Sequence, residues 1–268
     1  MSDQKSEQRD KIVSTAFNFQ EHYDSMVDMR TGMYKLNISV GQIFGSGGMH
    51  ISLKLFYNIL SLEDAGFGYG WRLNLTRYDR ALRRLTLSDG SNYVITRLLS
   101  EGEITSKLQY LKLNNLMVFF KANKITIYHK DGTQELLDEN GRIQNLVAPS
   151  GHQFTFKYGF GNRLISITDS AGKQFRILYE SGITRFMGMG NDSTVSIRIS
   201  SKKELNKVMM PHNLNIGISY KIVNGISMIE YVYHPTGATE KITYDPYGMK
   251  LALLPKSAVR AYLTPPQA

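Results

Sequence analysis

The chain has 268 residues, of which 42% are hydrophobic and 11% aromatic, so it can form a substantial core and does not have the composition of a disordered protein. It contains no cysteine, which excludes disulfide bonds and thiolate metal sites. Lysine and arginine exceed aspartate and glutamate by 32 − 23 = 9, which raises the question of an acidic or nucleic-acid partner.

Residues 1–26 are expected to form a polar N-terminal tail. The first ten residues are polar and no apolar stretch follows them, so the sequence shows no signal peptide. The longest apolar run, Leu116–Phe120, is far shorter than the roughly 20 residues that a membrane-spanning helix needs. We therefore expect no membrane span, and an export route other than Sec for any exported form.

After residue 27 the pattern becomes that of β-strands. Apolar and polar residues alternate with period two over residues 34–40 and again over residues 51–57. Such alternation is typical of strands that bury one face. The segment 45–48, Gly-Ser-Gly-Gly, is expected to be a flexible connection between them.

Three alternating glycines, Gly66, Gly68 and Gly70, precede the next expected strand. Glycine lets the backbone bend or approach another segment closely. Trp71, the single tryptophan of the chain, then opens an apolar alternation. We expect a strand that begins at Trp71.

The strongest signal is an internal repeat, because residues 142–158 align without a gap on residues 163–179. Each copy predicts a short strand, a glycine turn and an alternating second strand. An isolated hairpin is marginal in water, so such units must stack on their neighbours. The coincident residues are Arg142 and Arg163, Gly151 and Gly172, Gln153 and Gln174, Phe154 and Phe175, and Tyr158 and Tyr179.

Turn signals extend the hairpin pattern over this region. Glycines recur every nine to eleven residues, at Gly132, Gly141, Gly151, Gly161, Gly172 and Gly182. Asp-Gly and Asn-Gly pairs, as at residues 131–132 and 140–141, tolerate the positive φ of tight hairpin turns. We predict an all-β fold in which tandem antiparallel hairpins form a curved sheet.

The positive charge does not indicate a nucleic-acid interface. Such an interface needs cations gathered on one face. The densest group of cations is scattered singly along expected strands and fits a solvated outer face; it comprises Arg72, Arg77, Arg80, Arg83 and Arg84. We therefore expect no nucleic-acid partner.

No pattern of catalytic or metal-ligating residues stands out. The six histidines are isolated, without the spacing of metal-ligand pairs. The sequence has no Gly-x-Ser-x-Gly nucleophile elbow and no complete phosphate-binding glycine motif. We expect no metal, no cofactor and no enzymatic activity.

Aromatic residues are the remaining candidates for ligand contact. Trp71, Tyr158 and Tyr179 would stack on sugar rings if they lined an exposed face, which makes a carbohydrate-binding module the alternative function. Their periodic placement favours packing between strands instead. Aromatic cross-strand pairs contribute about 0.2–1 kcal/mol each.

Two sets of motifs carry a resemblance to a known family. The stretch Val27-Asp28-Met29-Arg30-Thr31-Gly32-Met33-Tyr34 is followed by Gly66-Phe67-Gly68-Tyr69-Gly70-Trp71-Arg72-Leu73-Asn74-Leu75. Together they resemble the opening segment of bacterial RHS proteins, the YD-repeat proteins of polymorphic and insecticidal toxins. The repeat over residues 142–179 resembles the YD repeat, and Tyr244-Asp245-Pro246-Tyr247-Gly248 is close to its signature.

The chain also departs from the family pattern. Tyr158 and Tyr179 are followed by glycine and glutamate where the YD repeat has aspartate. Met29 stands where the family usually has proline. The later core segment, with its self-cleavage region and variable toxic tip, has no counterpart in this sequence, which therefore resembles the N-terminal portion of such a protein.

The resemblance implies an organisation and a structural function. Residues 27–127 would be the RHS N-terminal β segment, 128–255 the YD-repeat β segment and 256–268 a flexible end. In the family, a β strip winds into a hollow, shell-like β-solenoid that encloses a toxic segment until delivery. The implied role is a non-catalytic part of this shell.

The resemblance also implies partners and a location. The partner would be the remainder of the shell or an adjacent toxin-complex subunit. The chain would reside in the bacterial cytoplasm before non-Sec export, and outside the cell as part of a toxin complex.

Overall fold

The computed structural model describes residues 23–27, 34–58, 64–97, 107–109, 116–121, 124–188, 194–244 and 261–264. Within these residues nearly all regular structure is antiparallel β-sheet, and the helical elements are three single 3-10 turns at Ser46–Gly48, Phe160–Asn162 and Pro211–Asn213. The predicted all-β fold class is confirmed. In the described part of the chain, no helix has the length and apolar character that crossing a bilayer would require.

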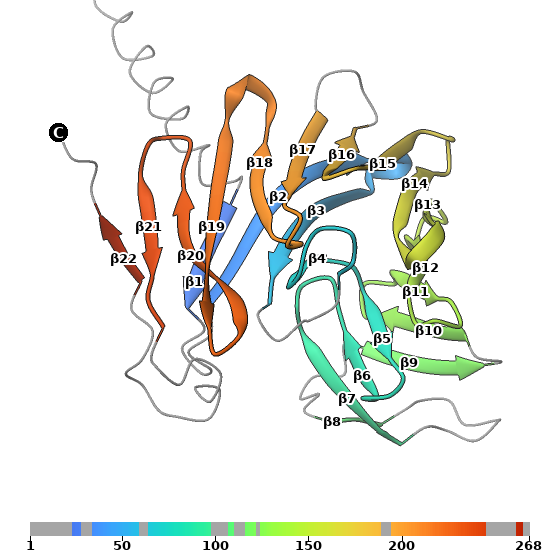
Figure 1. Cartoon of the computed structure of the whole chain (residues 1–268). Helices are drawn as coiled ribbons and strands as arrows, with labels where there is room; N and C mark the ends of the chain where they lie inside the picture. The colour runs from blue at the N-terminus through green and yellow to red at the C-terminus, as the bar shows by residue number, and fades with distance from the viewer. Residues whose placement is uncertain are drawn as a thin grey trace, which may run out of the picture.

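The largest sheet is a curved strip of fourteen described strands in which sequence neighbours pair throughout (Figure 1). Each strand of the strip thus pairs with the strands that precede and follow it in the sequence, as turn signals at regular spacing predict. The strands are β9 (Leu116–Lys121), β10 (Lys124–His129), β11 (Gln134–Leu137), β12 (Ile143–Val147), β13 (Gln153–Tyr158), β14 (Leu164–Asp169), β15 (Gln174–Glu180), β16 (Ile183–Met187), β17 (Thr194–Ile199), β18 (Leu205–Met209), β19 (Asn215–Val223), β20 (Ile226–Tyr233), β21 (Thr239–Ile242) and β22 (Ala261–Thr264).

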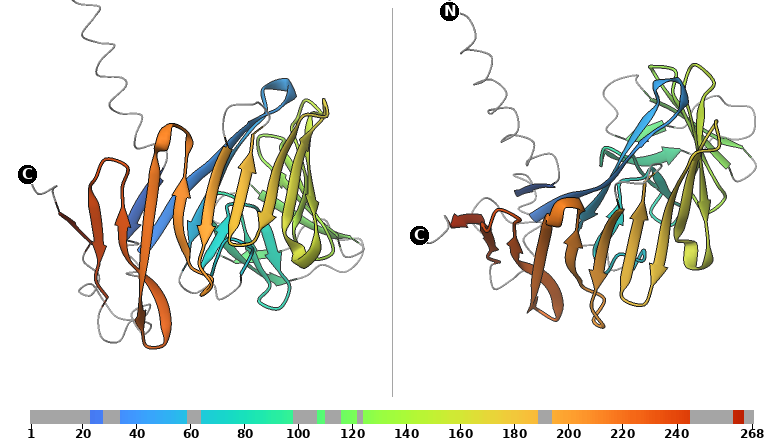
Figure 2. Two further views of the ribbon diagram at one scale, coloured as in Figure 1. Left: turned by 45° about the horizontal axis from the view of Figure 1, so that its top comes forward. Right: turned by 90° about the horizontal axis from the view of Figure 1, so that it is seen from above.

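Two four-stranded sheets precede the strip in sequence. The first contains β1 (Tyr23–Val27), β2 (Tyr34–Phe44), β3 (His50–Tyr57) and β4 (Trp71–Leu73). The second contains β5 (Arg77–Asp79), β6 (Arg84–Thr86), β7 (Asn92–Arg97) and β8 (Lys107–Gln109). Both lie on the same side of the strip (Figure 2).

Strand β2 lies across the strands of the strip and does not pair with them. Its first residue, Tyr34, lies beside Glu240 of β21, and Gly45 just beyond its end lies against the ring of Phe154 in β13. Eleven residues of extended chain reach roughly 37 Å, and the eight strand spacings from β21 to β13 cover roughly 38 Å. The two lengths match, so β2 runs along the length of the strip and across its strands, as the long blue hairpin in Figure 2 shows.

One continuous core fills the space between the β1–β4 sheet and the strip. It joins buried side chains of β2, β3 and β4 to those of strands between β12 and β21. A smaller core lies between the β5–β8 sheet and the first strands of the strip, where Tyr78 and Leu85 are in one cluster with Val118 and Ile127. The concave face of the strip is therefore covered along its length by the N-terminal sheets.

The observed strands shift three of the predicted boundaries. Strand β1 begins at Tyr23, inside the predicted polar tail, because it pairs with β2. The boundary expected between residues 127 and 128 falls inside β10, which pairs with β9, so the strip begins earlier than predicted. Strand β22 pairs with β21 inside the expected flexible end.

Candidate functional site

Four described tyrosines close hairpins of the strip with one repeated hydrogen bond. Each hydroxyl donates to the main-chain carbonyl of the residue 15 positions earlier, over 2.7 to 3.0 Å. The bond joins the two strands of a hairpin at the end away from its turn. The pairs are Tyr158 with Ile143, Tyr179 with Leu164, Tyr220 with Leu205, and Tyr244 with Ile229; we call them the tyrosine clamps.

The environment of the clamps makes them structural donors. All four rings are partly buried against the main core. Burial raises the pKa of each of these tyrosine hydroxyls above its ordinary value, because an ionised phenolate loses hydration there. The hydroxyls therefore keep their protons at neutral pH and donate them to the carbonyls.

The repeated arginines cover the rings of the first two clamps. The guanidinium of Arg142 lies 4.4 Å from the ring centre of Tyr158, and that of Arg163 lies 5.3 Å from the ring centre of Tyr179. Arg142 is also held by Asp138, whose Oδ2 accepts hydrogen bonds from Nε and Nη2. The arginine of the repeat is thus placed to stack on its tyrosine.

The repeated phenylalanines form the contact between the strip and β2. Phe154 and Phe175 are 0% and 1% exposed, and each ring faces a glycine of the crossing hairpin. A Cβ added at Gly45 would lie 2.5 Å from Phe154, and one at Gly41 would lie 2.8 Å from Phe175. Larger residues at these two positions would hold the hairpin away from the strip.

The repeated glycines occupy equivalent turns. Gly151 and Gly172 have φ of 83° and 82°, and each donates its N–H to the carbonyl three residues earlier. Lys203 takes the same place in the turn after β17, with a φ of 62° and the same hydrogen bond to Ser200. A lysine therefore takes the place of the glycine in this turn of the series.

The hairpin of β16 and β17 departs from the clamp pattern. In its register Ile199 stands where the other hairpins have the tyrosine, opposite Gly182, whose carbonyl accepts the N–H of Ile199 at 2.8 Å. Isoleucine has no hydroxyl to donate. The end of this hairpin is instead contacted by residues 64–70 from the N-terminal part of the chain.

Phe67 is the residue of this segment that packs against the β16–β17 hairpin. Its side chain is 3% exposed, and its ring centre lies 5.8 Å from that of Phe186 in β16 and 5.9 Å from that of Tyr179. The hydroxyl of Thr184 donates to the carbonyl of Gly66 at 3.3 Å. An aromatic ring from a distant segment thus packs at the one hairpin of the clamp series, among described residues, that lacks its own tyrosine.

Asp64 shapes the segment around Phe67. Its Oδ1 accepts the N–H groups of Gly66 at 2.8 Å and of Gly68 at 3.3 Å. Burial opposes ionisation, but these two donors and the ammonium of Lys203, 3.4 Å from Oδ2, lower the pKa of the Asp64 carboxyl below its ordinary value. The carboxylate therefore fixes the glycine-rich backbone in its docked conformation.

Trp71 belongs to the core. It is 1% exposed, its indole N–H donates to the Tyr220 hydroxyl at 2.9 Å, and its ring lies 5.3 Å from that of Tyr57. Gly70, just before it, has a φ of 81° and lies against the same Tyr57 ring. The first strand after the glycines is thus anchored to the third tyrosine clamp.

The surroundings of Trp71, Tyr158 and Tyr179 do not fit the expected role of these rings in sugar stacking. Trp71 is buried and offers no ring face to solvent. Tyr158 and Tyr179 bind carbonyls through their hydroxyls and are covered by Arg142 and Arg163. The physical reason is that the repeat places each ring at the junction of two strands, where it packs.

Part of the expected motif lies outside the described residues. Arg30 and Gly32 of the opening motif are not among them, and neither are Asp245 and Gly248 of the last repeat. Within the described chain no group of three or more histidine, aspartate or glutamate side chains could hold a metal ion.

Sequence reasoning missed Tyr220, Lys203 and Phe67 as members of this system. Tyr220 could have been found, because its distance of 15 residues from Leu205 equals that between Tyr158 and Ile143. Lys203 and Phe67 carry no such signal. Their roles depend on contacts between segments that are far apart in the sequence.

Comparisons with known proteins add a distant structural likeness. No family model and no curated protein matches the sequence. Solved structures similar to this chain include the crystal structure of TcdB2-TccC3, with 11% identity and a TM-score of 0.39, and that of TcdB2-TccC3-TEV, with 12% identity and a TM-score of 0.42. Each alignment covers 89% of this chain and 16% of the other, so this chain spans about a sixth of their length.

Proposed function

We propose that this chain is a non-catalytic structural module that forms the N-terminal part of a curved β shell of the RHS/YD-repeat kind. Such a shell would enclose a toxic segment for delivery. The proposal includes a partner, either the remainder of the shell or an adjacent toxin-complex subunit. It also includes a bacterial location, with export by a non-Sec route.

One observation carries the proposal: the repeated residues serve the scaffold. Tyrosine, arginine, phenylalanine and glycine of the repeat close hairpins, cover rings, contact β2 and form turns. A repeat that supported binding would present these rings to solvent. A repeat that builds a long curved wall needs them at the junctions between strands.

The arrangement of the strip supports growth of the wall by addition of strands. In the described chain β9 and β22 are the first and last strands of the sheet order, with one strand partner each. An unpaired strand edge is a template for pairing with another chain. Strand addition at either edge would lengthen the wall without changing the existing hairpins.

Size-exclusion chromatography with light scattering would test the proposal. The purified chain would be measured alone and mixed with the product of the neighbouring reading frame. We expect a defined complex of larger mass in the mixture. A monomer whose mass and elution do not change in the mixture would contradict the proposed partnership.

A further inference from the structure

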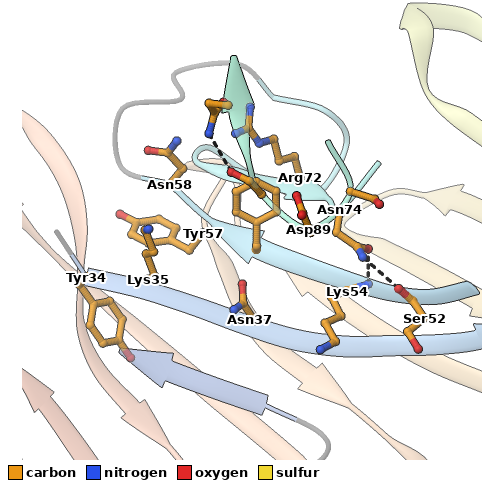
Figure 3. A pocket seen from close by; sticks show the side chains of 14 residues that line it. Tyr34, Lys35, Asn37, Ser52, Lys54, Tyr57, Asn58, Arg72, Asn74 and Asp89 are labelled. Atoms are coloured by element: carbon orange, nitrogen blue, oxygen red, sulfur yellow. Dashed lines mark hydrogen bonds between the residues drawn. The ribbon is translucent and has the colours of Figure 1, made fainter. Parts of the chain in front are cut away.

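A pocket of about 510 Å³ opens on the face of β2, β3 and β4 that is turned away from the strip. The turn between β6 and β7, at residues 88–92, forms its opposite wall, so two sheets build it together (Figure 3). Its volume lies within the range of small-molecule sites, about 300–1,000 Å³.

The strand register brings specific polar groups onto the pocket floor. Asn37 of β2 is opposite Phe56 of β3, which is opposite Arg72 of β4. Lys54 precedes Phe56 by two residues on the same face, so it is the diagonal neighbour of Arg72 at roughly 7–8 Å. Asn37 and Lys54 therefore lie side by side, as Figure 3 shows, and Phe56 separates Asn37 from Arg72.

The charge of the lining favours anions. Lys35, Lys54 and Arg72 contribute three cations, and Asp89 is the single acidic residue of the lining. Oδ1 of Asp89 already accepts the N–H of Ser91 at 2.8 Å. The remaining excess of two positive charges in a concave site concentrates anionic ligands.

The floor of the pocket is held in place before any ligand binds. The guanidinium of Arg72 lies 4.5 Å from the ring centre of Phe56. The amide of Asn74 accepts the N–H of Lys54 at 2.6 Å and donates to the carbonyl of Ser52 at 3.0 Å. The guanidinium of Arg72 and the main chain at Lys54 therefore lose little conformational entropy when a ligand binds.

The wall is also fixed. The N–H of Ser88 donates to the hydroxyl of Thr76 at 3.2 Å, and Thr76 is 1% exposed. The N–H of Leu87 donates to the carbonyl of Ser91 at 2.9 Å and closes the turn. The concavity therefore belongs to the fold and does not depend on a mobile loop.

We propose that this pocket binds a small polyanion that carries two or more phosphate or carboxylate groups. Lys54 and Arg72 each neutralise one anionic group, and the amide of Asn37 adds a hydrogen bond beside Lys54. This site is separate from the tyrosine clamps. The proposal goes beyond the shell function and does not rest on it.

Isothermal titration calorimetry on the full chain at low ionic strength would test the site, with inorganic pyrophosphate and citrate as the probes. We expect saturable binding with one site per chain, weakened by added salt. The variant Lys54→Ala should bind about tenfold more weakly, because it removes one charge-assisted contact. The matched control is Lys157→Ala, which removes an exposed lysine from β13 on the strip.

The outcomes separate cleanly. Binding of only one probe supports the proposal and identifies the anionic group that the pocket prefers. Equal weakening by Lys54→Ala and Lys157→Ala would overturn it, because the heat would then come from overall charge. If neither pyrophosphate nor citrate bound saturably at millimolar concentration, the proposal would also be overturned.

A second variant protects the test against a folding artefact. Asn37→Asp keeps the size of the side chain and places a carboxylate beside Lys54, so it should abolish binding while circular dichroism stays unchanged. Unaltered binding by this folded variant would contradict the assigned floor. Because all of these measurements use the chain alone, they do not depend on whether a shell partner is found.

Discussion

The hydroxyl of Tyr158 donates a 2.8 Å hydrogen bond to the carbonyl of Ile143, 15 residues earlier, and thereby joins the open end of the β12–β13 hairpin. The same relationship between Tyr179 and Leu164 closes the next hairpin. A single interaction repeated along the strip makes the repeat a structural device. It also gives the most direct prediction.

Tyr158→Phe should lower the free energy of unfolding by about 1–3 kcal/mol, because the Ile143 carbonyl would keep its partly buried position without this donor. Denaturant unfolding followed by circular dichroism measures the change. The matched control is Tyr233→Phe, since the Tyr233 ring is 45% exposed. Equal losses in the two variants would mean that the clamp contributes nothing.

Tyr220→Phe should cost more than Tyr158→Phe. The Tyr220 hydroxyl accepts the indole N–H of Trp71 at 2.9 Å and donates to the carbonyl of Leu205 at 3.0 Å, so its removal deprives two buried groups of their partner. Trp71 is the only tryptophan, and its fluorescence during urea unfolding reports this site directly. A loss no larger than that of Tyr158→Phe would count against the double role.

Gly68→Ala should destabilise the protein by about 1–3 kcal/mol. Gly68 has a φ of 95°, and a Cβ there would lie 2.9 Å from the carbonyl oxygen of Lys203, so the methyl group would push residues 64–70 away from the strip. The comparison is Gly172→Ala, where φ is 82° but nothing lies within 4 Å of an added Cβ.

Thermal unfolding of both glycine variants separates backbone strain from lost docking. Both changes impose a similar strain on φ, so the larger loss at Gly68 measures the contact with the strip. If the two variants had the same midpoint, this segment would not be closely docked.

The pair of His129 and Glu135 should make stability depend on pH. The hydrogen bond that Nε2 of His129 donates to Oε1 of Glu135, over 2.7 Å, raises the pKa of His129 above its ordinary value. A raised pKa means that the folded state binds the proton more tightly, so the stabilisation is complete below pH 6.5, the ordinary value, and is lost as pH rises through the folded-state pKa.

The variant Glu135→Gln tests that dependence. Its free energy of unfolding should fall below that of the parent at about pH 6, and the difference should shrink by about pH 9. His50→Gln, at an exposed position, is the control and should show a small difference at both values. A difference for Glu135→Gln that is constant with pH would contradict the linkage.

Much of the strip could be derived from local sequence. Alternating side chains define strands, and glycine or asparagine at tight turns sets where each strand ends, because both properties depend on a few neighbouring residues. Three residues of the repeat, Arg142, Phe154 and Tyr158, make contacts within the scaffold. For Tyr158 and Tyr179 the sequence left sugar stacking as an alternative, although their periodic placement favoured packing between strands.

The sequence by itself therefore determined an all-β chain of tandem hairpins. Only the tertiary structure showed that β2 lies across the strands of the strip and that Phe67 packs beside the hairpin without a tyrosine. It also showed that Trp71 donates a hydrogen bond to Tyr220, 149 residues away. No spacing rule encodes such contacts. They depend on which surfaces meet once the hairpins have curved, and burial of those surfaces places the rings inside the core and leaves the cations of β3 and β4 around the pocket.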